Sequence, residues 1–126
     1  MNKKGPLWKS FYHAFCGIIE NIIKERNLRI HVTIMLCVIL AGLLLKISLL
    51  EWIICMILFG MVISLELVNT AIETTIDIYV DKFNEKAKHA KDTSAGAVLV
   101  AAIIAAIIGI IIFLPKLISI LNNISK

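Results

Sequence analysis

Charged residues are scarce in this chain, and so are cysteine, proline and glycine. Only 17% of the 126 residues are Asp, Glu, Lys or Arg, while 60% are hydrophobic, a share far above that of a soluble domain. Three cysteines without CxxC spacing argue against a disulfide framework and a cysteine metal site. No basic stretch interleaves with a polar, aromatic face, which argues against a nucleic-acid partner. The composition therefore predicts an integral membrane protein.

Long apolar runs fill most of the chain and set its organisation. Near the N-terminus, apolar residues recur at steps of three and four with polar residues between them, a pattern typical of a helix lying in the headgroup layer. Later runs are long enough to cross a bilayer. We expect one all-α membrane domain over 1–126, comprising an amphipathic interfacial helix at 7–28, transmembrane helices at 30–46, 49–80 and 95–115, and a connection at 81–94.

The basic residues are distributed unevenly between the two sides of the predicted membrane helices. Ten of the 13 precede the first span or lie between the second and third, and three lie on the other side. Positively charged segments tend to remain in the cytoplasm. The sequence thus predicts a multi-pass protein of the cell membrane with a cytoplasmic N-terminus, a cytoplasmic 81–94 connection and an outside C-terminus.

The second membrane helix carries a polar stripe. Glu66, Asn69, Glu73 and Asp77 follow one another at steps of three, four and four, so they share an arc of about 80° on one helix face. The charged side chains of Asp77 and Glu73 need no function if this end of the helix emerges into water. Glu66 follows a fully apolar stretch, where an ionisable side chain is costly and usually functional.

Carboxylates without neighbouring His or Cys at ligand spacing indicate a hard cation. Mg²⁺ is often held by one or two carboxylates, with water and phosphates completing its shell. Glu25 lies just before the first span, at the cytoplasmic level predicted for Glu73, so two helices could clamp one ion. An ordinary solvated carboxylate remains the alternative for Glu25.

The predicted connection ends in polar residues that run directly into the third span. Lys91 could neutralise phosphate charge, while Asp92, Thr93 or Ser94 could cap a helix whose free N–H groups attract anions. Capping alone would explain these three residues but does not require Lys91. The chain has no GxxxxGK[ST] loop and no protein-kinase glycine loop, so a nucleotide would need another arrangement.

Small residues recur every four positions along the third span, at Ala97, Ala101, Ala105 and Gly109. This spacing permits close approach of helices within lipid, and we expect it to serve packing. Three spans enclose little polar volume. We therefore expect a neighbouring subunit to complete the site.

Two segments together resemble the small prokaryotic diacylglycerol kinase and undecaprenol kinase family. The first is Glu66-Leu67-Val68-Asn69-Thr70-Ala71-Ile72-Glu73, with Asp77 one turn later. The second is Ala90-Lys91-Asp92, followed by the small residues 94–97. The likeness extends over about residues 9 to 109, and acidic Glu25 and basic Arg29 also match family positions.

This resemblance implies a homotrimeric membrane kinase that uses ATP and Mg²⁺. It implies that Glu66 is the general base and that Glu25 and Glu73 bind the metal. The residues implied to surround ATP are Asn69, Asp77, Lys91, Asp92, Glu25 and Glu73, and those implied to contact the lipid are Lys9, Arg29, His31 and Glu66.

The lipid substrate implied by the resemblance depends on the residue at position 31. His31 is similar to the undecaprenol kinase branch, whereas relatives favouring diacylglycerol tend to carry an acidic residue there. Undecaprenol is the expected substrate and diacylglycerol the alternative. A function of another class is also open, since a non-enzymatic membrane assembly protein would use the same three spans.

Overall fold

The computed structural model describes residues 6–124, which form four α-helices and no strand. The helices are α1 (Leu7–Lys24), α2 (Arg26–Leu44), α3 (Leu49–Tyr79) and α4 (Glu85–Ile124). Within the described chain, α2, α3 and α4 are long and apolar enough to cross a membrane. The expected all-α fold with three spans is confirmed.

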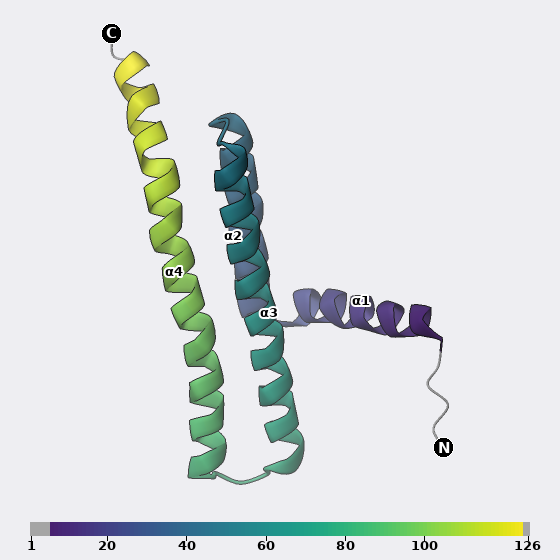
Figure 1. The fold of residues 1–126 in the computed structure, drawn as a ribbon. Helices are drawn as coiled ribbons and strands as arrows, with labels where there is room; N and C mark the ends of the chain where they lie inside the picture. The colour runs from purple at the N-terminus through teal and green to yellow at the C-terminus, as the bar shows by residue number, and fades with distance from the viewer. Residues whose placement is uncertain (1–5, 125–126) are drawn as a thin grey trace.

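The three spanning helices lie side by side, with α3 packed mainly against α4 and also against α2 (Figure 1). The chain reverses direction between α2 and α3, and again between α3 and α4. As a result, residues 80–84 lie at one end of the bundle and the C-terminal turns of α4 at the other (Figure 1). α3 is the central helix, because it contacts each of the other three.

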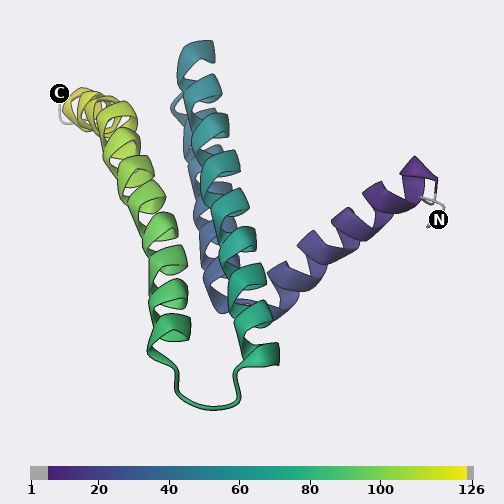
Figure 2. The ribbon, with the colours of Figure 1, turned by 60° about the horizontal axis from the view of Figure 1, so that its bottom comes forward.

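The interfacial helix α1 projects sideways from the bundle (Figures 1 and 2). None of its residues is buried, and its apolar side chains, including Trp8, Phe11 and Phe15, are exposed. An exposed apolar face on an amphipathic helix suits the headgroup layer of a membrane. The helix ends at Lys24, four residues before the expected boundary at 28.

A single extended residue turns the chain from the interfacial helix into the first span. Glu25 has φ −89° and ψ 119°, and α2 begins at the next residue. The Arg29 guanidinium donates a 2.7 Å hydrogen bond to the carbonyl of Ile23, which ties the two helices across this corner. Leu28 is fully buried and therefore has to belong to the bundle, which is the physical reason for the earlier break.

A tight turn connects α2 to α3 at the end of the bundle far from residues 80–84. Ser48 and Glu51 form a capping box, in which the Ser48 N–H donates to the Glu51 carboxylate at 2.6 Å. A Cβ atom on Gly42 would lie 2.8 Å from the Trp52 ring, so glycine allows this close packing. Lys116 of α4 pairs with Glu51 at 3.1 Å and joins the third span to the turn.

The fourth helix is longer at both ends than expected. It begins at Glu85 because the Asn84 side chain accepts hydrogen bonds from the backbone N–H groups of Lys86 and Ala87. The connection is therefore confined to residues 80–84, and the expected boundaries at 81–94 and 95–115 are corrected. Pro115 lies inside the helix instead of ending it, and the last turns bend away beyond it (Figure 2).

Candidate functional site

The polar stripe of α3 is partly buried within the bundle. Glu66 is only 3% exposed and Asn69 only 4%, whereas Glu73 is half-buried and Asp77 is exposed. Both buried residues lie on the α3 face that meets α2 and α4. Because a buried carboxylate inside a membrane protein is costly, Glu66 requires specific neighbours.

The groups that act electrostatically on the Glu66 carboxyl come from α2, α3 and the corner before α2. They are His31, Glu73 and Glu25, with a smaller effect from the Asn27 side chain. Glu25, which is 41 positions earlier in the sequence, is therefore among the groups whose charge acts on Glu66. We call Glu66 and the residues that act on it the Glu66 cluster. Asn27 was not among the predicted site residues, because nothing in its spacing connects it with the α3 stripe.

A chain of hydrogen bonds links α3 to α4 at the level of Asn69. The Ser94 hydroxyl lies 2.7 Å from Asn69 Oδ1, and Asn69 Nδ2 lies 3.4 Å from Glu73 Oε1. The Asn69 amide donates from its N–H₂ group to Glu73 and accepts from the Ser94 hydroxyl with its oxygen. The Ser94 Oγ also lies 2.9 Å from the Lys91 carbonyl, so its single proton is shared between that carbonyl and the nearer Asn69 oxygen.

Two ion pairs lie in the N-terminal part of α4. Lys91 Nζ lies 2.6 Å from Asp77 Oδ1 and joins α4 to the end of α3. Lys88 Nζ lies 2.6 Å from Asp92 Oδ2, one turn away on the same helix. Lys91 thus faces the α3 stripe, whereas the Asp92 carboxylate pairs along the surface of α4.

Asp92, Thr93 and Ser94 were expected as possible helix caps, and this expectation is wrong. All three lie inside α4, whose first turn begins at Glu85. Thr93 instead donates a hydrogen bond to the carbonyl of His89 within the helix, at 2.8 Å. The free N–H groups of the helix start lie near residue 85, so they are separated from the α3 stripe by about two turns of α4.

The remaining predicted lipid-contacting residues lie in different places. His31 is half-buried on α2 beside the Glu66 cluster. Arg29 is exposed and holds the corner between α1 and α2. Lys9 lies in the first turn of α1, the end farther from the bundle, with its ammonium 5.8 Å from the centre of the Trp8 ring (Figure 1). Within one chain, Lys9 is not part of the Glu66 cluster.

Among residues 6–124, no group of three or more His, Cys, Asp or Glu side chains is arranged to enclose a metal ion. The two predicted metal-binding residues, Glu25 and Glu73, supply hard oxygen donors and no sulfur or imidazole. That donor set fits Mg²⁺, which commonly takes one or two protein carboxylates and completes its shell with water and phosphate oxygens. It does not fit a metal that demands an all-protein cage.

Comparison with known proteins places this arrangement in one family. Residues 12–113 match the family model described as prokaryotic diacylglycerol kinase. The chain is 48% identical to the undecaprenol kinase of Bacillus subtilis over 92% of its own length and 94% of that protein. It is 40% identical to a diacylglycerol kinase of Synechocystis, over 89% of its own length and 65% of the relative. It is 30% identical to the Helicobacter pylori diacylglycerol kinase, covering 75% and 73% of the two chains.

Proposed function

This chain belongs to the prokaryotic diacylglycerol kinase family and is a membrane lipid kinase, and we propose that it transfers the γ-phosphoryl group of ATP to the hydroxyl of undecaprenol. The observation that carries the proposal is that Glu66, the first residue of the polar stripe, is buried. The next residue of the stripe, Asn69, is hydrogen-bonded to Ser94 of α4. Membership in a family of kinases decides against the non-enzymatic assembly protein.

In this reaction a bond forms between the alcohol oxygen and the γ-phosphorus, while the bond from that phosphorus to the bridging β-γ oxygen breaks. The alcohol proton has to leave as the new bond forms, and ADP carries away the electron pair. Glu66 is the general base, since its carboxylate is the buried acceptor nearest the apolar part of α3. Exclusion of water by the surrounding helices strengthens each electrostatic contact at this point.

The nucleotide occupies the polar side of the cluster, toward residues 80–84. Lys91 contributes the positive charge for phosphate oxygens, and its ammonium is paired with Asp77. Asn69 offers an oriented amide, while Asp77 and Asp92 stand at the rim of the same side of the bundle. Binding of phosphates would therefore require Lys91 to exchange at least part of its contact with Asp77.

Glu25 and Glu73 are the residues that would hold Mg²⁺. When bound, the ion offsets negative charge on the phosphates. The two glutamates would also place negative charge near Glu66, and His31 stands beside the same carboxyl. With Arg29 at the corner of α1 and α2, His31 would guide the lipid headgroup toward Glu66.

The functional unit is proposed to be a homotrimer in the cell membrane. A Lys9 that lies away from the Glu66 cluster of its own chain could contact lipid at the site of an adjoining copy. The clustering of basic residues at the N-terminal side and around residues 80–94 supports a cytoplasmic N-terminus, where ATP is present.

Undecaprenol is favoured over diacylglycerol as the acceptor because the match to the undecaprenol kinase covers 94% of that protein at 48% identity. Diacylglycerol is the second candidate, supported by the 40% identity to the cyanobacterial diacylglycerol kinase. Both alcohols present a hydroxyl on an apolar body, so the same chemistry serves either.

The testing experiment compares turnover of undecaprenol, diacylglycerol and ceramide by the purified protein in lipid nanodiscs, with ATP and Mg²⁺. Formation of undecaprenyl phosphate with the highest kcat/KM supports the proposal. A higher kcat/KM for diacylglycerol would change the substrate, and the lack of any lipid phosphate with all three alcohols would overturn the function.

A further inference from the structure

Helix α4 is about twice as long as a membrane span requires. Its 40 residues extend over roughly 60 Å at the helical rise, whereas the hydrocarbon core of a bilayer is about 30 Å thick. Part of the excess is the polar segment from Glu85 to Ser94, at the end of the bundle near residues 80–84. The rest lies at the opposite end, where the last turns of α4 are rich in apolar side chains.

Polar side chains mark the membrane boundary at this opposite end of the bundle. The Ser48–Glu51 capping box begins α3 there, and Lys116 of α4 pairs with Glu51 at 3.1 Å. Ser94 and Lys116 are 22 positions apart, which corresponds to roughly 33 Å of helix and is enough to cross the hydrocarbon core. Residues 117–124 therefore lie at or beyond the edge of that core.

The segment 117–124 is an amphipathic helix. At about 100° per residue, its five large apolar side chains fall within an arc of about 160°, and its three polar side chains share the opposite side. The apolar residues are Leu117, Ile118, Ile120, Leu121 and Ile124, and the polar residues are Ser119, Asn122 and Asn123. All eight are exposed. An apolar face of this size is unfavourable in water and indicates an apolar surface against which it lies.

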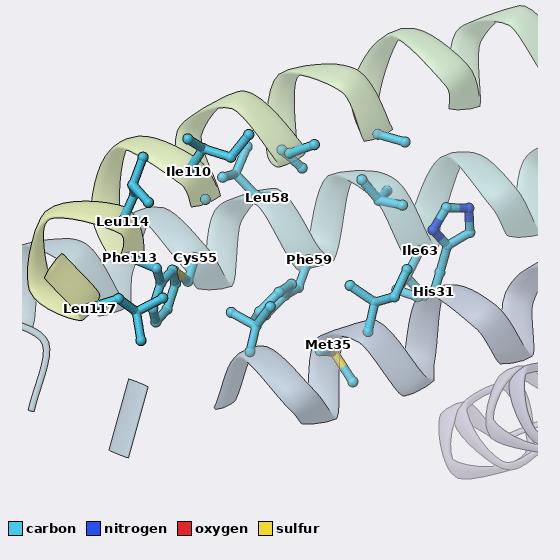
Figure 3. Close-up of a pocket in the computed structure, with 17 residues that line it drawn as sticks. His31, Met35, Cys55, Leu58, Phe59, Ile63, Ile110, Phe113, Leu114 and Leu117 are labelled. Atoms are coloured by element: carbon cyan, nitrogen blue, oxygen red, sulfur yellow. The ribbon is translucent and has the colours of Figure 1, made fainter. Parts of the chain in front are cut away.

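The apolar face of the segment continues the apolar surface of the bundle. Figure 3 shows Leu114 and Leu117 at one end of an apolar groove between α2, α3 and α4. Nearer the middle of α4, Ala105 and Gly109 line the same groove, whereas Ala101 of the small-residue stripe is buried as expected. The side of α4 that carries Leu117 thus faces the membrane interior and not the water outside.

Pro115 separates the segment from the span. Proline lacks a backbone N–H, and its ring clashes with the preceding turn, so it bends a helix. The last turns of α4 lean away from the direction of the earlier turns (Figure 2). A straight continuation would carry the apolar face about 12 Å farther into water, whereas the bend turns it toward the plane of the membrane.

We propose that residues 117–124 bind the lipid headgroup layer, as an interfacial helix at the membrane surface opposite to residues 80–84. The apolar face lies toward the acyl chains and the polar face toward water. Lipid is favoured over a second copy of the chain, because the segment leaves the bundle at the level of the headgroups, where lipid is the surrounding apolar medium. The role is independent of the proposed lipid acceptor, since no residue of the segment belongs to the Glu66 cluster.

The test measures how deep single side chains of the segment lie in a membrane. The full chain, with Cys16, Cys37 and Cys55 replaced by alanine, receives one new cysteine per variant, which carries a nitroxide spin label. The labelled protein is placed in nanodiscs of phosphatidylethanolamine and phosphatidylglycerol. Collision rates with O₂, which concentrates in lipid, and with a water-soluble nickel chelate then give the depth of each label.

The variants are chosen as pairs from the two faces of the segment. Leu121→Cys and Asn123→Cys form the matched pair, because both residues are exposed and lie about 200° apart around the helix. Ile124→Cys and Ser119→Cys repeat the comparison independently. Ile111→Cys is the deep reference, because Ile111 is an exposed residue within the span.

We expect the labels at Leu121 and Ile124 to lie about 5–10 Å inside the headgroup boundary, and those at Ser119 and Asn123 to lie nearer to water. The label at Ile111 should be deeper than all four. Equal, high access of the nickel chelate to all four positions would place the segment in water and overturn the proposal. Low access of both reagents to Leu121 and Ile124 would assign the face to a second copy and overturn it as well.

The two pairs keep the test decisive. If Leu121→Cys does not assemble to the oligomer mass of the unmodified protein, the pair of Ile124→Cys and Ser119→Cys gives the same comparison. The depths are read without any measurement of turnover. A failure of the proposed kinase reaction would therefore leave this result unaffected, and the reverse also holds.

Discussion

Removal of one hydroxyl at the contact between α3 and α4 should disturb ATP use. Ser94 lies 2.7 Å from Asn69 Oδ1, and Asn69 in turn lies 3.4 Å from Glu73. In Ser94→Ala, the Asn69 oxygen loses its donor while remaining 4% exposed. The amide then keeps only its 3.4 Å contact with Glu73 and is held less firmly in place.

The magnitude follows from the burial of the orphaned oxygen. A buried polar group without a partner costs about 1–3 kcal/mol, which corresponds to a factor of about 5 to 150 in an equilibrium constant. If half of this cost is relieved by rearrangement, kcat/KM for ATP should fall about 2- to 12-fold. Ser94→Thr keeps a hydroxyl at the same position and should retain most of the activity.

The assay measures KM for ATP, KM for the lipid alcohol and the thermal midpoint of the same samples. A positioning role raises KM for ATP more than KM for the lipid, whereas a purely structural role lowers only the midpoint. Ser64→Ala is the control, because Ser64 is an exposed serine of α3. The reasoning is refuted if Ser94→Ala leaves KM for ATP unchanged, or if Ser64→Ala raises it equally.

Three further predictions concern the metal, the nucleotide and the fold. Glu25→Ala and Glu73→Ala should each raise the Mg²⁺ concentration for half-maximal activity, and the double variant should be less impaired than the product of the singles; unchanged Mg²⁺ curves would reject the clamp. Lys91→Met should raise KM for ATP about tenfold or more, while Lys24→Met, which breaks an exposed pair with Glu20 on α1, should change it less than about threefold. Gly42→Val should lower the free energy of unfolding by about 1–3 kcal/mol, because the new side chain meets the Trp52 ring; an unchanged denaturation midpoint would contradict this packing.

The sequence was sufficient to predict the membrane helices and the polar stripe of α3. Apolar runs determine what can cross a bilayer, and the three- and four-residue steps from Glu66 to Asp77 place these residues on one face whatever the rest of the chain does. The proximity of Glu25 to the stripe was also anticipated, because both were assigned to the cytoplasmic level of neighbouring helices. Glu25 is among the groups whose charge acts on Glu66, and a shared metal site of Glu25 and Glu73 stays a prediction.

Other features depend on contacts between helices and could not be derived from spacing. Asn84 caps α4 and ends the connection there. Ser94 therefore lies inside the helix, where its hydroxyl contacts Asn69 and does not cap the helix. Small residues at four-residue spacing are compatible with close packing and with a groove alike. In the structure Gly109 faces open space, because a Cβ atom added there would meet no atom within 4 Å.

The most direct test of the central claim is turnover of undecaprenol by Glu66→Gln, measured together with ATP binding. The substitution removes the proton acceptor at the buried end of the polar stripe and keeps the side-chain volume. The account predicts a fall in kcat of about 10²–10⁴, with ATP affinity and oligomer mass unchanged. Near-normal turnover by this variant would contradict the account and assign the base to another carboxylate.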